Sequence, residues 1–172
     1  IAARLATEEH KLDRVLIIDW DVHHGNGTQD TFWRSEQVGF VSIHRWPFYP
    51  GTGAEEETGS GPGSGFTRNL PVTFGTSRKE YLTRFENSLQ DLIKKMSPQL
   101  ILLSAGFDSH RADPIGSLGL EVEDFASLTR LVVECAAATA EGKIVSVLEG
   151  GYNVEILPEC VEVHLRGLLA KA

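Results

Sequence analysis

Two carboxylates and an imidazole stand at alternate positions after an apolar run near the start of the chain. They are Asp19, Asp21 and His23, and they follow Val15–Ile18. Alternate side chains of an extended strand share one face, so these groups would crowd together at the strand end. Like charges that are close and partly desolvated are unfavourable unless a cation lies among them. The spacing therefore predicts a metal site, and carboxylate with imidazole suits an open zinc site.

Two further polar segments follow apolar runs later in the chain. Residues 104–110 contain Asp108, and residues 149–153 contain Tyr152 after a pair of glycines. Sites in parallel α/β sheets form at the carboxyl ends of the strands, so these segments are predicted to converge on the first one. Each residue also has a plainer interpretation, because an aspartate at a strand end commonly caps a turn, and the tyrosine could simply be a packed aromatic.

Asp21, His23 and Asp108 are predicted to supply three metal ligands, which leaves a fourth position for water as a catalytic zinc requires. Two anionic ligands and a neutral one leave bound Zn²⁺ formally neutral, yet the ion still polarises a carbonyl and acidifies its water. The remaining histidines have no spaced partner and are interpreted as surface or hydrogen-bonded core residues. They are His10, His24, His44, His110 and His164.

The elements that must position these groups follow from the apolar pattern. Four segments with a continuous apolar character are predicted to be buried strands of a parallel sheet covered on both faces. They are Val15–Asp19, Val38–Ile43, Leu100–Ser104 and Ile144–Leu148. Helical periodicity predicts helices between several of them. They cover Ile1–Leu12, Ser77–Met96, Glu121–Glu141 and Glu155–Leu169. The alternation predicts an α/β fold with three layers, αβα, in a single domain over residues 1–172.

Local signals mark some of these boundaries. Ser77 and Glu80 predict a capping box, and Gly142 is the expected C-terminal cap of the helix before it. The glycine-rich stretch 50–65, which contains Glu55–Glu57, is predicted to be a long irregular loop. It is interpreted either as a flexible surface connection or as a functional loop. One hypothesis places the glutamates near the mouth of the site, where they would favour cationic substrates.

Composition narrows the classes of function. The chain has 172 residues and a formal net charge of −8. The acidic balance argues against direct nucleic-acid binding, which needs a basic face. The longest apolar runs have the size of strands, so no membrane span is expected. Cys135 and Cys160 are interpreted as small buried residues, and the expected location is the cytoplasm, or the nucleus in a eukaryote.

Several ordered motifs resemble the zinc-dependent histone deacetylase and acetylpolyamine amidohydrolase family, which has an arginase-like α/β fold. The motifs are Asp19–Gly27, Val41–His44, Pro50–Gly53, Ser104–Asp108, Asp113–Pro114 and Glu149–Asn153. They span most of the chain, and Phe107 with the Glu149–Tyr152 run resembles the class II and bacterial branches more than class I. The resemblance implies a hydrolase that removes acetyl or acyl groups from lysine side chains or acetylated amines.

The resemblance also implies roles for individual residues. Asp21, His23 and Asp108 match the zinc ligands, and Tyr152 matches the tyrosine that hydrogen-bonds the substrate carbonyl and then the oxyanion. A structural K⁺ site matches Asp19, Ser42 and the carbonyl of Ile43, together with the Asp21 and His23 carbonyls. A second monovalent site matches the carbonyls of Phe32, Ser35, Val38 and Phe66. The acyl-lysine channel matches Tyr49, Gly150 and Gly151, with Ile115 at its rim.

One family feature has no counterpart in this sequence. The general base of the family belongs to a tandem histidine motif upstream of the strand that carries Asp21, and only a short helix precedes Val15 here. The chain is therefore expected to be the C-terminal portion of a deacetylase catalytic domain whose N-terminal portion is absent, with metal affinity and little turnover by itself. Its expected partner is an acetylated protein, polyamine or small molecule.

Two alternatives stay open. A non-catalytic metal-binding or interaction remnant would lack the general base altogether. An arginase-type binuclear hydrolase would carry a further set of aspartate and histidine ligands for a second divalent metal, and the sequence shows no such set.

Overall fold

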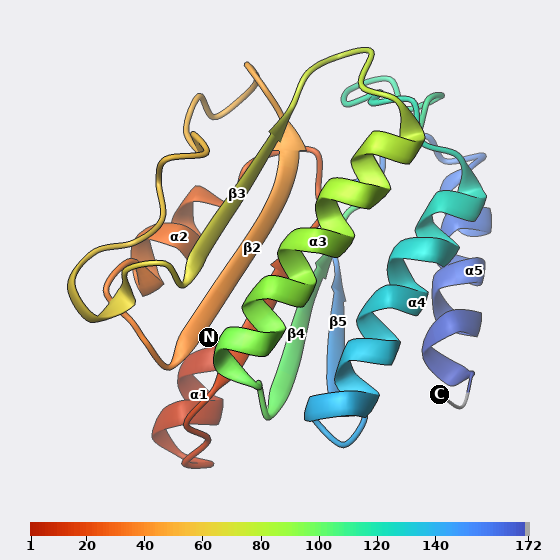
Figure 1. Ribbon diagram of the computed structural model, residues 1–172. Helices are drawn as coiled ribbons and strands as arrows, with labels where there is room; N and C mark the ends of the chain where they lie inside the picture. Colours follow the sequence, from red (N-terminus) through yellow and green to blue (C-terminus); the bar gives the residue numbers. More distant parts are fainter. Residues whose placement is uncertain (171–172) are drawn as a thin grey trace.

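A five-stranded parallel sheet organises the chain in the computed structural model, which describes residues 1–170 (Figure 1). The order across the sheet is β3-β2-β1-β4-β5. The strands are β1 (Val15–Asp19), β2 (Val38–Arg45), β3 (Thr67–Val72), β4 (Leu100–Ala105) and β5 (Ile144–Leu148). Every neighbouring pair is parallel, so all the carboxyl ends lie along one edge. The predicted α/β class is confirmed.

Strand β1 lies in the centre of the sheet because its short apolar run can be buried on both faces. Leu16 and Ile18 belong to one core cluster, which also contains side chains from helices α3 (Arg78–Met96) and α4 (Val122–Thr139). Val15 and Ile17 belong to a second cluster. That cluster includes side chains from α1 (Ala2–Glu8) and α2 (Asn26–Phe32). Helices therefore flank both faces of the sheet, as expected.

Strand β5 differs from its prediction. It was expected to be covered on both faces, yet Val145 is 48% exposed and Val147 is 54% exposed. It lies at the edge of the sheet with β4 as its neighbour. Helices α1 and α2 cover Ile17 and Leu102 on the neighbouring strands, and these helices leave the two valines of β5 exposed. An apolar run predicts what a strand is able to bury, and it does not show which neighbours cover that strand.

The predicted helices are present, and α5 (Leu157–Leu169) is the last of them. Several of these helices are shorter than predicted at one or both ends. The Ser77 hydroxyl accepts the N–H of Glu80 at 3.2 Å, as expected at the start of α3. The full reciprocal capping box forms instead at Glu121 and Asp124. The N–H of Gly142 donates to the carbonyl of Ala136 at 3.0 Å beyond the end of α4.

Three short elements were not predicted from the sequence. They are α2, strand β3 and the 3₁₀ turn η1 (Gly61–Gly63). Helix α2 is too short and polar to show an apolar period. Strand β3 carries Asn69 and Pro71 in place of an apolar run, and it is an edge strand, where proline is tolerated.

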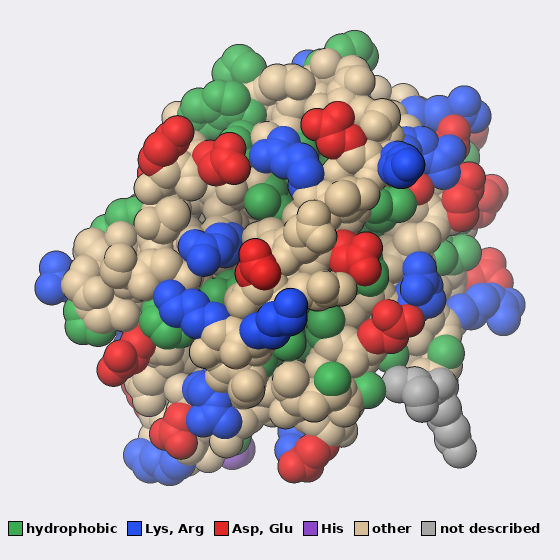
Figure 2. All heavy atoms as spheres, viewed as in Figure 1, with side chains coloured by type: hydrophobic (Ala, Val, Ile, Leu, Met, Phe, Trp, Pro, Cys, Tyr) green, Lys and Arg blue, Asp and Glu red, His purple; other side chains and the backbone are tan. Residues whose placement is uncertain are grey.

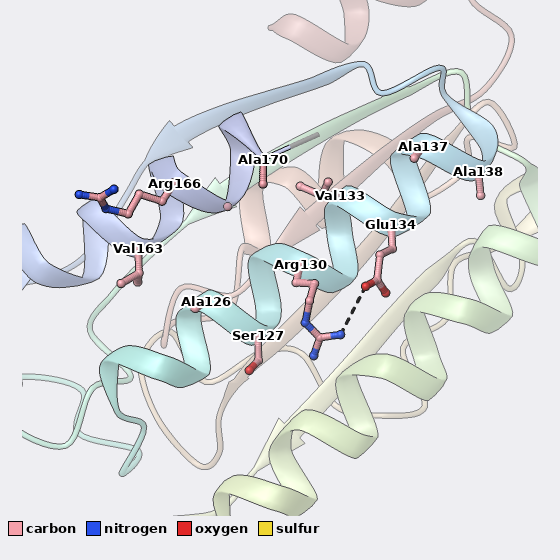
Figure 3. Close-up of a pocket in the computed structure, with 11 residues that line it drawn as sticks. Ala126, Ser127, Arg130, Val133, Glu134, Ala137, Ala138, Val163, Arg166 and Ala170 are labelled. Atoms are coloured by element: carbon pink, nitrogen blue, oxygen red, sulfur yellow. Dashed lines mark hydrogen bonds and ion pairs between the residues drawn. The ribbon is translucent and has the colours of Figure 1, made fainter. Parts of the chain in front are cut away.

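Helices α4 and α5 pack closely because small residues line their contact. A Cβ at Gly167 would come within 2.7 Å of the Thr129 Cγ2. On the outer side of this pair runs a groove lined largely by small or apolar side chains, with the Arg130–Glu134 ion pair at its margin (Figure 3). None of the residues lining this groove belongs to the polar segments that follow the strands.

The surface is charged and mixed in sign. On the face that Figure 2 shows, acidic and basic side chains alternate, with apolar groups between them. The net charge of −8 therefore does not gather into a patch of one sign on this face. Among residues 1–170, no helix has both the length and the apolar character needed to cross a bilayer.

Candidate metal centre

The polar segments after β1 and β4 meet at one edge of the sheet. Asp19 pairs with Ser104 in the β1–β4 register, so the residues that follow both strands leave the sheet side by side. One ligand atom from each of Asp21, His23 and Asp108 lies within 4.8 Å of the others. The structure thus brings together the three residues that the sequence predicted to converge.

Backbone amides fix the orientation of the two carboxylates. The N–H of Gly150 donates to the Asp21 Oδ2 at 2.8 Å, and the N–H of Val22 donates to the Asp108 Oδ1 at 2.9 Å. The His23 Nδ1 then lies 2.9 Å from the Asp21 Oδ1 and 3.3 Å from the Asp108 Oδ2. One acceptor from each carboxylate is therefore directed at the same imidazole nitrogen.

The environment of the Asp108 carboxylate fits a bound cation. Its Oδ2 is buried and has no hydrogen-bond partner among the described residues. A buried acceptor without a partner costs free energy, and the cost is larger for a charged group. A cation placed among the Asp108 Oδ2, the Asp21 Oδ1 and the His23 Nδ1 would satisfy it. Carboxylate and imidazole donors with an open position fit zinc.

Burial gives two of the carboxylates unusual protonation behaviour. Burial, followed by the charge of Asp21, raises the pKa of Asp108 to about 8. Burial and then Asp21 also raise the pKa of Asp19 well above its ordinary value. Both shifts favour the protonated form of the carboxyl group. A bound cation would reverse this by favouring their charged forms.

Glycines allow the backbone to come close to the carboxylates. A Cβ on Gly150 would collide with side-chain oxygens of both Asp108 and Asp21. A Cβ on Gly106 would lie 2.6 Å from the Asp21 Oδ2. The two glycines therefore contribute to the site because they have no side chain, and any side chain would occupy the space beside the proposed ligands.

Tyr152 lies beside this cluster. It lines the same hollow, of about 480 Å³, as Asp21 and His23. Its side chain is half exposed, and its N–H donates to the Asp113 Oδ2 at 2.8 Å. Burial, followed by the charge of Asp108, raises the pKa of its hydroxyl. The hydroxyl therefore stays protonated at neutral pH and is able to donate a hydrogen bond.

The residues matched to a structural K⁺ site lie beneath the cluster. Asp19 is buried and accepts the Asp21 N–H at 3.0 Å. The β1–β2 register sets Asp19 opposite Ser42, which is also buried, and Ile43 follows in the same strand. This pairing places the Asp19 carboxylate and the Ser42 backbone on adjacent strands.

The residues matched to a second monovalent site gather at the other end of β2. The Phe32 carbonyl accepts the Ser35 N–H at 2.9 Å in the turn between α2 and β2. The Ser35 hydroxyl accepts the Val38 N–H at 3.1 Å. The Phe66 carbonyl accepts the Phe40 N–H at 2.8 Å. Phe32, Ser35 and Val38 are thus linked in one turn, and Phe66 joins the same end of β2 through Phe40.

The channel residues take different positions around His23. Tyr49 is 77% exposed, and its ring stands edge-on to His23 at 6.2 Å between centroids. Phe48, which sequence reasoning missed, is stacked on His23 at 5.2 Å with an interplanar angle of 22°. Its position beside Tyr49 in an aromatic and proline cluster was the only signal for it. Ile115 is half exposed in the loop after β4.

The hypothesis about the glutamates is wrong for Glu57. Its carboxylate turns inward, where it accepts from the Gln29 Nε2 at 2.6 Å and from the Gly53 N–H at 3.2 Å. The Asn69 side chain also donates to the Glu57 carbonyl at 3.1 Å. Residues 50–65 are thus tied to α2 and β3, and the interpretation as a flexible connection does not hold. Glu55 and Glu56 remain exposed.

The remaining histidines lie as predicted. His10 is exposed. His24 contacts Thr52 and Gln29, and His44 contacts Ser42 and the Gly53 carbonyl. His110 accepts from the Ala112 N–H, and His164 contacts Thr129 and Ser146. Among residues 1–170, His23 is the histidine that joins two aspartates in a cluster with metal-ligand spacing.

Known proteins are similar to this chain over nearly its whole length. The histone deacetylase domain family matches residues 1–168. A probable deacetylase of Archaeoglobus fulgidus is 43% identical over 143 residues, which cover 83% of this chain and 40% of the relative. The chloroplastic histone deacetylase 10 of Oryza sativa subsp. japonica is 40% identical over 171 residues, which cover 99% of this chain and 39% of the relative. The chain spans about two fifths of the length of these curated relatives.

Solved structures agree with these relatives. The HDA15 HD domain superimposes with a TM-score of 0.89 at 35% identity, over 98% of this chain and 47% of that one. The acetylpolyamine aminohydrolase of Burkholderia pseudomallei superimposes with a TM-score of 0.87 at 33% identity, over 98% of this chain and 49% of that one. Sequence and fold point the same way, and the chain belongs to the histone deacetylase domain family.

Proposed function

We propose that this chain carries the metal-binding part of a zinc-dependent deacetylase. The complete enzyme would remove acetyl or acyl groups from lysine side chains or from acetylated amines. The observation that carries the proposal is the buried Asp108 Oδ2, which has no hydrogen-bond partner among the described residues and lies 3.3 Å from the His23 Nδ1 beside Asp21. Relatives named as deacetylases, and the likeness to an acetylpolyamine aminohydrolase, support the reaction class.

Each residue of the cluster has a proposed role. Asp21, His23 and Asp108 would hold the zinc ion, which when bound supplies a Lewis acid and an acidified water. The Tyr152 hydroxyl, on the rim of the same hollow, would donate a hydrogen bond to the substrate carbonyl and to the negative charge that develops on it. Gly150 and Gly151 would line the channel for the acyl-lysine chain, with Tyr49 as one wall and Ile115 at the rim.

Two structural cations are proposed to support this centre. Asp19, Ser42 and Ile43, with the Asp21 and His23 carbonyls, would hold a K⁺ ion beneath the zinc. The buried position and the raised pKa of Asp19 support a cation there. The carbonyls of Phe32, Ser35, Val38 and Phe66 would hold the second monovalent ion. Carbonyl and carboxylate oxygens are suitable ligands for such hard cations.

The general base is proposed to come from a part of the complete protein outside these 172 residues. In the described part of the hollow, the histidines are His23 and His24. The first is assigned to the metal, and the ring of the second is engaged with Thr52 and Gln29. The chain covers about two fifths of its relatives. We propose that it belongs to the C-terminal portion of the catalytic domain.

Zinc stoichiometry tests the proposal directly. We expect the purified chain to bind zinc and the Asp108→Ala variant to lose most of it, because one of three ligands is removed. Asp124→Ala is the matched control, since Asp124 of helix α4 is also buried but pairs with Arg78 of helix α3. Full retention of zinc by Asp108→Ala would refute the assignment.

Deacetylation by the complete protein tests the reaction. We expect Tyr152→Phe to lower kcat by about 10²–10³-fold on an acetyl-lysine peptide or an acetylpolyamine, the range for loss of one donor to an oxyanion. Zinc binding should survive this change, because Tyr152 is not among the clustered ligands. A complete protein that binds zinc and deacetylates neither class of substrate would favour the non-catalytic alternative.

A further inference from the structure

Arg45 occupies an unusual position next to the candidate metal centre. It is the last residue of β2, and its N–H donates to the Val22 carbonyl at 2.9 Å, beside the segment that carries two of the proposed ligands. Its side chain is partly buried. Among residues 1–170 it makes no ion pair with a carboxylate, although the chain is acidic overall. A partly buried charge without a counter-charge needs another source of stabilisation.

Aromatic rings and a carbonyl supply that stabilisation. The guanidinium carbon lies 4.5 Å from the ring centroid of Phe48 and 5.4 Å from that of Phe74. The Nη1 donates to the Gly116 carbonyl at 2.9 Å. The planar guanidinium is suited to this combination, because it stacks on a ring while its N–H groups form directed hydrogen bonds.

The Phe48 ring contacts both the Arg45 guanidinium and the proposed ligand His23. It is stacked on the His23 imidazole at 5.2 Å with an interplanar angle of 22°. A metal-bound histidine is usually oriented by a hydrogen bond from its second ring nitrogen to a carboxylate or a carbonyl. In the described part of the chain, the His23 Nε2 makes no such bond, and the polar contacts of the ring are made by its Nδ1. The rings around the imidazole therefore orient its plane, with Phe48 stacked face to face on it and Tyr49 edge-on to it.

We propose that Arg45 is a positioning residue for the metal ligand His23. Anchored on the Gly116 carbonyl, its guanidinium holds Phe48 flat against the imidazole, so that the Nδ1 stays directed between the two aspartates. This role rests on the proposed metal site and adds to it a residue that touches neither metal nor substrate.

Co²⁺ binding tests the proposal, with the metal alone as the probe and its visible absorption as the report on ligand geometry. We expect Arg45→Gln to weaken Co²⁺ affinity by about tenfold, the lower range for residues that orient a ligand, and to change the absorption spectrum. Arg45→Lys should recover part of both, because a lysine keeps the cation over the ring and loses the planar fork. Thermal unfolding of each variant identifies any that fails to fold.

A matched control and a double variant separate positioning from general destabilisation. Arg84→Gln removes an equally half-buried arginine whose Nη1 also donates to a backbone carbonyl at 2.9 Å, that of Pro71, from helix α3. We expect it to leave Co²⁺ affinity and spectrum unchanged. In a Phe48→Leu background, Arg45→Gln should have no further effect, because the ring through which it acts is gone.

The outcomes are distinguishable. Wild-type affinity and spectrum in Arg45→Gln would overturn the role of Arg45 while leaving the metal site intact. An undiminished effect of Arg45→Gln in the Phe48→Leu background, or an equal effect of Arg84→Gln, would also overturn it. A wild-type chain that binds no Co²⁺, or an Asp108→Ala variant that binds it equally well, would overturn the metal site itself.

Discussion

At the scale of single residues, the candidate metal centre depends on an absent side chain as much as on those present. Gly150 donates its N–H to the Asp21 Oδ2 and passes so close to Asp108 that a Cβ would strike both carboxylates. The same peptide group thus orients one ligand and leaves space for the other. A residue with any side chain would have to displace one of them.

Gly150→Ala is therefore expected to damage both the fold and metal binding. Overpacking a well-filled site costs about 1–3 kcal/mol, and displaced carboxylates should lower zinc affinity as well. Gly27→Ala is the control, because a Cβ there meets nothing within 4 Å. Urea unfolding and a zinc titration of both variants provide the measurements. Unchanged zinc affinity in Gly150→Ala would contradict the close approach.

His44 predicts how stability depends on pH. Burial, followed by the charge of His24, lowers its pKa from 6.5 to about 4 in the folded chain. The unfolded chain binds the proton more readily, so the contribution of His44 to stability is full above pH 6.5 and falls as the pH drops towards 4. The shift corresponds to a loss of roughly 3 kcal/mol at most.

Urea unfolding at several pH values measures this dependence. We expect His44→Gln to flatten the curve between pH 6.5 and 4, without abolishing it, because burial also lowers the pKa values of His24, His110 and His164. His10→Gln is the control, since His10 is exposed. An identical slope in His44→Gln and the wild type would show that His44 does not titrate in this way.

Residue types and spacing were sufficient to predict which groups converge. Asp21 and His23 alternate after an apolar strand, and Asp108 follows a second strand of the same character. Phe48 and Arg45 could not be found in this way, because their proposed roles arise from ring contacts, between Arg45 at the end of β2 and Phe48 and between Phe48 and His23 in the loop after β1. The inward orientation of Glu57 could not be predicted either. Its partners are Gln29 and Asn69, which lie in elements whose sequences show no apolar period.

At the scale of elements, β1 and β5 are strands of similar sequence and different environment. Both are short, apolar and β-branched. Every residue of β1 is buried, and the strand pairs on both sides, with β2 and β4. Strand β5 pairs with β4 at the edge and leaves apolar side chains exposed.

Native-state hydrogen exchange should separate the two strands. We expect the hydrogen-bonded amides of β5 to exchange on the order of tenfold or more faster than those of β1, because an exposed edge strand opens without global unfolding. Amides of β4, which pairs with both, are the internal reference. Equal protection of β1 and β5 would mean that the chain unfolds as a single unit.

Element order was predictable where long apolar periods or runs exist, as in α3, α4 and the central strands. The prediction failed where tertiary contacts, and not the local sequence pattern, determine the secondary structure. Strand β3 contains Asn69, whose amide serves the network around Glu57, and Pro71, which an edge position tolerates. Strand β3 therefore carries a polar residue that hydrogen-bonds a neighbouring loop, and its sequence shows no apolar pattern by which the strand could be predicted.

At the scale of the whole molecule, the proposed ligands join separate parts of the sheet. Asp21 and His23 follow β1, Asp108 follows β4, and the amide of Gly150 that orients Asp21 follows β5. A ligand that binds only this assembled arrangement stabilises the entire fold by mass action.

Zinc should therefore raise the stability of the complete chain. At a free concentration of 100 times Kd the gain is about 2.7 kcal/mol, which corresponds to a rise in Tm of several degrees for a domain of this size. Thermal unfolding with zinc and with a chelator measures it. Asp108→Ala should show no rise. An equal rise in that variant would place the stabilising zinc elsewhere.

The separation of the proposed ligands along the chain also sets an order of events during synthesis. The Val22 N–H and the Asp108 carboxylate that it contacts are 86 residues apart. At about 5–20 residues per second, Asp108 leaves the ribosome roughly 4–17 s after the residues around Val22. Until then the nascent chain carries two of the three proposed ligands, Asp21 and His23. If the proposed zinc site forms, its complete ligand set exists only after the β4 segment has been made, when the central strands β1 and β2 are already in place.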